Sequence, residues 1–467
     1  MLAHAWLFQQ VWIAESHREL RAENIDFRAR EERITSERTA AIADILQNEG
    51  LDGVIRSAEL SDAPATIGRA LARHDADIDE VGLVKAALGV AGEGLRQSAL
   101  LAGYLAALSG EARSDLTHQI ASAVSSKKLL TFLTCLPFEA STWAVVEDAD
   151  EGTRKEYWAD VHVQWLLSDS GDASLPVERL IEAKRPWAAF FAVSHQVDGL
   201  PTELLETLLL SMATTNGEEA KLANRDYYVK DTFETLRERG LENDRLALLE
   251  LMFLPLLAWS DPGTPALDAK VANDSDAFMQ LIAWGWKRKG DGDDPVRWFA
   301  APFGNRKVAA SLSFDFFHHT RMVPGLSEDG HLDTERLTSW VEEVRQAAAA
   351  NGRAEIADIK IGSVLINAAE DATGQWPPRP VCEALERYRS KQMGDGFYTA
   401  IMNARGVHWR GEGGGQERTL AEKYRGMSQK VRLEYPFVGK VLDMVVSSYE
   451  RQAEHEDGEA RLRKRLP

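Results

Sequence analysis

The chain has little cysteine, no long apolar run and a shortage of positive charge. Its 467 residues include only two cysteines, Cys135 and Cys382, too far apart in the sequence for a CxxC pair or a disulfide framework. No stretch approaches the roughly 18 consecutive apolar residues of a membrane-spanning helix. Lys and Arg number 54 against 73 Asp and Glu, and the formal net charge of −19 argues against a broad nucleic-acid surface. These absences predict a cytoplasmic protein with neither a membrane partner nor a nucleic-acid partner.

The common catalytic and cofactor signatures are also missing. The sequence contains no GxxxxGK[ST] phosphate loop and no GxGxxG motif after a strand. It also lacks a GxSxG nucleophile elbow, an HExxH zinc helix and an EF-hand loop. We therefore expect no cofactor, and the sequence favours a protein that is not an enzyme.

What the sequence does contain is helical periodicity. Apolar residues with the i, i+3, i+4, i+7 spacing of one helix face are Leu337, Trp340, Val341, Val344 and Ala348. The same spacing recurs over 204–212, 246–256, 361–368, 381–388 and 438–449, with glycine and proline breaks between these stretches. Two short stretches, 142–146 and 161–165, fit a strand or a helix equally well. The pattern predicts an all-α fold, a helical-hairpin array resembling an α-solenoid in two or three subdomains.

The breaks in this pattern suggest where the subdomains meet. Gly, Asp and Pro concentrate at 147–153, 260–265, 289–295 and 325–330. We expect an N-terminal helical subdomain over residues 1–140, a central helical-repeat subdomain over 141–310, and a C-terminal helical subdomain over 311–467. The chain opens on an apolar helical pattern, which is compatible with one portion of a longer multidomain protein or with packing on a partner.

Asp315, His318 and His319 form the first group of candidate catalytic or metal-binding residues. On a helix, their i, i+3, i+4 spacing brings the carboxylate and both imidazoles to one face, as metal ligands or acid–base pairs require. The neighbouring phenylalanines equally fit a core helix with a hydrogen-bonded polar edge, and the sequence shows no third ligand cluster nearby. Both interpretations remain open.

A glycine- and arginine-rich stretch, residues 403–418, forms the second group. Its glycines permit positive φ, its arginines offer fork-shaped donors, and it runs into a helix whose first N–H groups favour anions. The alternative is a tight interhelical loop whose arginines pair with Glu412, Glu417 or other acidic neighbours. The candidate anion- or partner-binding residues are Arg405, Gly406, Arg410, Gly414, Gly415, Gln416 and Arg418.

Thirteen tryptophans are spread along the chain. Such residues are typical of helix-packing anchors, but tryptophan is also enriched at the energetic centres of protein interfaces. Trp284 and Trp286 lie two positions apart and cannot both face one core from a single helix. One of them is therefore expected at an exposed or partner-facing position.

Several short segments of the C-terminal half carry a resemblance to a known class. They are 323–325, 356–362, 375–378, 403–406, 414–418 and 449–453. Over residues 240–467 the chain resembles the C-terminal helical region of large bacterial STAND-type anti-phage defence ATPases. The resemblance implies a helical array that senses or binds a partner. It implies the sensor part only, because the chain lacks a Walker A segment and a recognisable effector.

The leading hypothesis is thus a non-enzymatic helical scaffold or sensor that binds a protein partner in bacterial defence. The alternative is an enzyme or ligand-binding protein that holds a phosphate-bearing small molecule at the 403–418 stretch, together with Asp315, His318 and His319.

Overall fold

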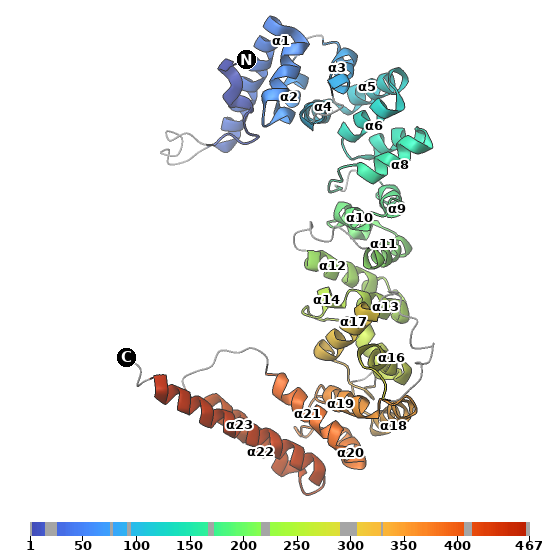
Figure 1. Cartoon of the computed structure of the whole chain (residues 1–467), viewed down its shortest axis with the longest axis vertical. Helices are drawn as coiled ribbons and strands as arrows, with labels where there is room; N and C mark the ends of the chain where they lie inside the picture. The colour runs from blue at the N-terminus through green and yellow to red at the C-terminus, as the bar shows by residue number, and fades with distance from the viewer. Residues whose placement is uncertain are drawn as a thin grey trace. The chain divides into compact units, whose positions relative to one another are not determined.

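The computed structural model divides the chain into two compact units, Met1–Leu222 and Ala223–Pro467. It describes residues 2–14, 26–74, 78–90, 95–166, 172–215, 225–289, 306–327, 330–405 and 413–463. Within these ranges there are 23 α-helices and two short 3-10 helices (Figure 1). The one β-type pairing in the described ranges is a bridge between Leu326 and Leu332. The prediction of an all-α helical array is confirmed.

The first unit contains η1 (Leu2–Phe8), α1 (Phe27–Leu60), α2 (Pro64–Ala72), α3 (Glu80–Val90), α4 (Leu95–Ala107), α5 (Gly110–Ala123), α6 (Ser126–Cys135), α7 (Ala140–Asp148), α8 (Glu151–Asp160), α9 (Ser174–Glu182), α10 (Pro186–Val193), η2 (Val197–Gly199) and α11 (Thr202–Thr214). Its main helix pairs join elements close in chain order, such as α2 with α4, α6 with α8 and α9 with α10. Packing between near neighbours is what an array of helical hairpins requires.

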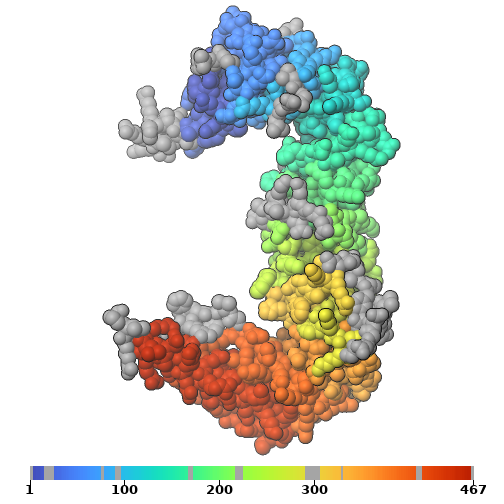
Figure 2. All heavy atoms as spheres, viewed as in Figure 1, coloured from blue at the N-terminus to red at the C-terminus, as the bar shows by residue number. Residues whose placement is uncertain are grey.

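The second unit contains α12 (Arg225–Glu238), α13 (Asn243–Met252), α14 (Leu254–Leu257), α15 (Pro265–Asn273), α16 (Ser275–Gly285), α17 (Arg306–His319), α18 (Thr334–Ala350), α19 (Ala354–Leu365), α20 (Arg379–Tyr388), α21 (Lys391–Asn403), α22 (Gly415–Val431) and α23 (Pro436–Arg463). It closes on a hairpin, in which α22 and α23 pack side by side (Figure 1) and form the red part of the surface in Figure 2. None of the helices in the described ranges has both the length and the apolar content to cross a bilayer.

The boundary between the units differs from the expected subdomain borders near residues 140 and 310. The first border lies at the start of α7, and α6 packs against α8 across it. The second falls inside α17, which begins at Arg306. The Gly, Asp and Pro signals that suggested borders are turn signals, and such signals also mark connections within a unit.

Local chemistry explains where the helices begin and end. Asp333 caps α18 by accepting a hydrogen bond from the N–H of Arg336 (2.9 Å), and the chain leaves the helix at Gly352 with a φ of 64°. Proline occupies the first turn of α2, α10, α14, α15 and α20. Of the two ambiguous stretches, 142–146 lies in α7, whereas 161–165 is irregular and pairs with no strand in the described ranges.

Glycine lets two pairs of helices cross in close contact. In the first unit, a Cβ on Gly68 would lie 2.0 Å from the carbonyl oxygen of Leu100, and one on Gly103 would lie 2.1 Å from that of Ala65. These distances are far below van der Waals contact, so α2 and α4 can approach each other only because both positions lack a side chain. Gly362 and Gly396 do the same for α19 and α21 in the second unit.

An aromatic cluster fixes α17 against its neighbours in the second unit. The ring of Phe278 in α16 packs edge-on against Phe317 (5.2 Å between centroids) and against Trp340 of α18 (4.9 Å). Trp286, just beyond the end of α16, continues the cluster to Phe317 (5.7 Å) and Phe314 (4.8 Å). The rigid cluster therefore positions the outer face of α17, which carries Phe314 and the histidines.

Candidate functional site

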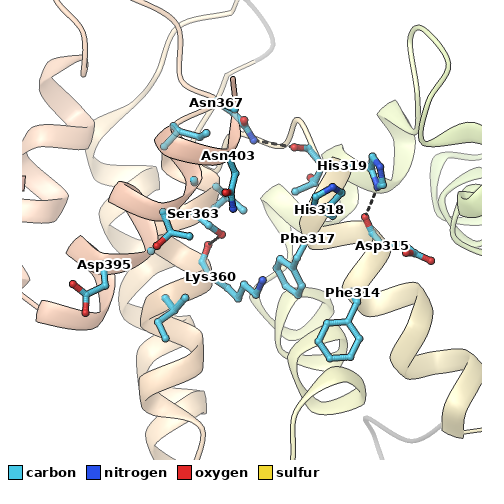
Figure 3. Close-up of a pocket in the computed structure, with 18 of the residues that line it drawn as sticks. Phe314, Asp315, Phe317, His318, His319, Lys360, Ser363, Asn367, Asp395 and Asn403 are labelled. Atoms are coloured by element: carbon cyan, nitrogen blue, oxygen red, sulfur yellow. Dashed lines mark hydrogen bonds between the residues drawn. The ribbon is translucent and has the colours of Figure 1, made fainter. Parts of the chain in front are cut away.

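A groove of about 730 Å³ lies between α17, α19 and α21 in the second unit (Figure 3). Asp315, His318 and His319 line it from α17, and Asn403 and Ala404 line it from the end of α21. The structure thus brings the histidine group and the first residues of the 403–418 stretch to one surface. Other lining residues include Trp259, Phe314, Phe317, Lys360, Ser363, Asn367, Asp395 and Thr399. We refer to this surface as the groove.

The three helices end together at one end of the groove. Figure 3 shows His319, Asn367 and Asn403 there, near the last turns of α17, α19 and α21. The side-chain amide of Asn367 donates hydrogen bonds to the carbonyl oxygens of Thr320 (3.1 Å) and Met322 (3.2 Å), which ties the end of α17 to the end of α19. Carbonyl groups concentrate at helix C-termini, so this end of the groove attracts positive groups.

The hydrogen bonding of His319 indicates its tautomer. Its Nδ1 lies 2.9 Å from the backbone oxygen of Asp315, so in the neutral ring Nδ1 carries the proton and Nε2 is an acceptor. Nε2 is buried and has no partner in the described part of the chain. The ring packs edge-on against Trp259 (4.4 Å between centroids) and against His318 (4.7 Å).

The structure offers no support for a metal centre at this surface. Within the described residues, no three His, Cys, Asp or Glu side chains lie close enough to hold a metal ion. Asp315, His318 and His319 do line the groove together, as their spacing predicted, but their side chains do not converge closely enough to hold an ion. The aromatic rings around His319 match the alternative interpretation of a core helix with a polar edge.

Lys360 places a positive charge in apolar surroundings at the other end of the groove. Its Nζ lies 4.9 Å from the ring centroid of Trp286 and 5.0 Å from that of Phe317. Burial lowers the pKa of the Lys360 ammonium, because an apolar environment disfavours the charged form. No carboxylate in the described ranges forms an ion pair with it. The two rings compensate part of the lost hydration through cation–π attraction.

Two aromatic side chains at the groove are unusually open to solvent. The side chain of Trp259, which follows α14, is 80% exposed, and that of Phe314 on α17 is 50% exposed. Trp286 is half-buried against Phe314, whereas Trp284 is buried. Aromatic side chains that stay exposed beside a concave surface are typical anchors for a binding partner.

The described arginines of the 403–418 stretch are engaged within the chain. Arg405 donates to the carboxylate of Glu417 (2.7 Å), which is 2% exposed, and to the side-chain oxygen of Gln416 (3.1 Å). Arg418 forms an ion pair with Asp457 and thereby lowers the pKa of that carboxyl. For these two arginines, the contacts agree with the alternative in which they pair with acidic residues of the chain. Of the other candidate residues, Gly406 and Arg410 lie outside the described residues.

The two glycines that open α22 differ in their surroundings. A Cβ on Gly414 would lie 2.2 Å from the carbonyl oxygen of Ala453, so this glycine permits close contact between the start of α22 and α23. Its N–H donates to the carboxylate of Asp457 (2.9 Å). A Cβ on Gly415 would meet open space. The requirement for glycine at 414 is therefore explained by packing without an anion.

Comparison with known proteins yields no relationship. No protein-family model, no curated protein and no solved structure matches the chain. The interpretation of the groove consequently depends on its own residues.

Lys360 and Trp259 are the main groove residues that sequence reasoning missed. Lys360 lies on the apolar stripe of α19 formed by Ala357, Ile361 and Val364, at the i+3 position where a core residue is expected. A lysine on such a stripe could have been recognised from the sequence as a candidate site residue. The exposure of Trp259 could not have been predicted from the sequence, because it depends on how the turn after α14 meets α17.

Proposed function

We propose that this protein is a non-enzymatic helical scaffold or sensor that binds a protein partner through the groove. The observation that carries the proposal is the pair of exposed aromatic side chains, Trp259 and Phe314, at a groove large enough for a peptide segment. Interface energy concentrates in such residues when a partner covers them, and their truncation commonly costs about 2 kcal/mol or more of binding free energy.

The alternative of a phosphate-binding protein has weaker support. A phosphate site at the 403–418 stretch needs arginines that can turn toward the ligand, whereas Arg405 and Arg418 already pair with Glu417 and Asp457. We therefore do not place a small-molecule site there. A phosphate-bearing ligand that raised the melting temperature of the wild type but not of Arg405→Ala would reverse this choice.

A role in bacterial defence, as the sensor part of a STAND-type system, remains part of the proposal. Its support is the resemblance of residues 240–467 and the array packing of the second unit, which contains the groove. Both cysteines, Cys135 and Cys382, are free and buried, which suits the reducing cytoplasm proposed as the compartment.

Quantitative affinity purification from the host lysate tests the proposal. We expect the tagged chain to capture one protein at near-stoichiometric amounts. The double variant Trp259→Ala/Phe314→Ala should reduce that capture at least about tenfold, because it removes both anchors. Mass spectrometry with isotope-labelled reference peptides gives the ratio, in samples with and without phage challenge.

The matched control for this experiment is Tyr227→Ala. Tyr227 on α12 is also an exposed aromatic residue of the second unit, 65% exposed, but it does not line the groove. The Tyr227→Ala variant should capture the partner in the same amount as the wild type. Equal capture by the wild type and the double variant would show that the partner, if one is found, binds elsewhere.

A further inference from the structure

The charge of Lys360, which has no ion-pair partner in the part of the chain that the structure describes, indicates what an occupant of the groove must carry. A half-buried ammonium without a counter-ion is unfavourable for folding, since the charge loses hydration and regains only part of that energy from the two rings. An apolar residue of similar length would fill this position on α19 without that cost. A residue that lowers stability in this way is typical of a binding site.

Among the described residues, no carboxylate forms an ion pair with Lys360. Asp315 and Asp395 line the same groove, yet neither forms an ion pair with it. Figure 3 shows both carboxylates turned away from the ammonium, with the ring of Phe317 between Lys360 and Asp315. The place beside Nζ is thus available to an acidic group from outside.

We propose that the groove binds a peptide segment of the partner that inserts an aspartate or glutamate side chain beside Lys360, while apolar residues of the same segment cover Phe314 and Trp259. This inference rests on the proposed function and specifies the partner's chemistry. A carboxylate that leaves water together with the ammonium forms a charge-assisted hydrogen bond, about twice as strong as a neutral one.

The distribution of charge along the groove favours an acidic group at the Lys360 end only. The opposite end, at Asn367 and Asn403, is formed by three helix C-termini and disfavours anions. The acidic residue of the segment is therefore expected at a fixed end of the groove.

Selection from a random-peptide display library against the full chain tests the inference. We expect selected peptides to carry Asp or Glu next to aromatic or aliphatic residues. They should bind Lys360→Met at least tenfold more weakly, as measured by fluorescence anisotropy of the synthesised peptides. Selection against Lys360→Glu should yield peptides with Lys or Arg in place of the acidic residue. Lys440→Met, which removes an exposed lysine on α23, is the matched control and should bind like the wild type.

The outcomes separate this inference from the proposed function. Peptides that lose binding in Trp259→Ala/Phe314→Ala but lack a carboxylate, or bind Lys360→Met equally well, would overturn the acidic-segment inference and leave protein binding at the groove intact. If no selected peptide depends on Trp259 or Phe314, both the inference and the proposed function fail.

The thermal stability of Lys360→Met provides an independent test of the inference. Lys360→Met should melt at a higher temperature than the wild type, because it removes from apolar surroundings a charge that no described carboxylate pairs with. The folded-state pKa of Lys360 lies below its usual value of 10.5, so between these two values the unfolded chain binds more protons and wild-type stability rises with pH. The advantage of Lys360→Met should therefore shrink over that range. A variant less stable than the wild type would show that the ammonium is already satisfied within the chain, which overturns the inference.

Discussion

Replacing Gly362 with valine is expected to destabilise the second unit by about 3 kcal/mol or more. A Cβ at this position would lie 2.0 Å from the carbonyl oxygen of Met393, and across the same crossing a Cβ on Gly396 would lie 2.0 Å from that of Ile359. The obstacle is backbone on both sides, so no rotamer change relieves the clash. The helices α19 and α21 must separate, and the groove they form must widen.

Urea unfolding followed by circular dichroism gives the free-energy change, and amide hydrogen exchange shows whether the loss concentrates in α19 and α21. Gly426→Ala is the control. It lies on the exposed face of α22, where a Cβ meets open space, and alanine there should stabilise by about 0.5–1 kcal/mol. If Gly362→Val unfolds within about 1 kcal/mol of the wild type, the close crossing of α19 and α21 is not as described.

Arg237→Met should destabilise the second unit by about 3–5 kcal/mol. The side chain of its partner, Glu250, is fully buried between α12, α13 and α15, where its carboxylate accepts hydrogen bonds from Arg237 (3.1 Å) and from the N–H of Leu267 (2.8 Å). Without the arginine, the buried carboxylate keeps its backbone hydrogen bonds from Leu267 and Ala266 but loses the positive charge that balances it. Thermal and urea unfolding of the full chain measure the loss.

The effect of Arg237→Met should depend on pH in a defined direction. Burial already raises the pKa of Glu250 above its usual value of 4.5, and loss of the arginine raises it further. A carboxyl with a raised folded-state pKa lowers stability as pH rises from 4.5 through that pKa, so the variant should be least impaired in acid. Arg237→Met/Glu250→Gln should recover most of the loss, because an amide accepts the Leu267 bond without charge. A loss that is independent of pH, or no rescue by glutamine, would contradict this description of the pair.

The sequence predicted the helices well because the signals that form them are local. The stripe from Leu337 to Ala348, the cap at Asp333 and the stop at Gly352 all act within one helix, and α18 follows them closely. The boundary after Leu222 was not predicted, since the Gly, Asp and Pro signals used to place borders also occur at turns inside a unit. For example, Asp150 in the expected break at 147–153 simply caps α8 within the first unit.

The groove was predictable only in part. The spacing of Asp315, His318 and His319 placed them on one face, and the glycine-rich stretch drew attention to the end of α21. What the sequence did not contain was the crossing of α19 over α21, which brings Lys360 within reach of the same surface. Contacts between segments more than 30 residues apart depend on backbone approach at Gly362 and Gly396, and no local pattern reports that approach.

Site-specific photo-crosslinking at Phe314 tests most directly whether the groove binds a protein. Benzoylphenylalanine in place of Phe314 keeps the phenyl ring and adds a photoreactive benzoyl group, for which the half-exposed position leaves room toward solvent. It should form a covalent adduct with the protein that co-purifies with the wild type. The same group in place of Glu422, exposed on α22 away from the groove, serves as the control and should form none. An adduct from position 314 whose crosslinked peptide contains an acidic residue is the expected result. No adduct at 314, or equal adducts at both positions, would contradict the assignment of the groove as the binding surface.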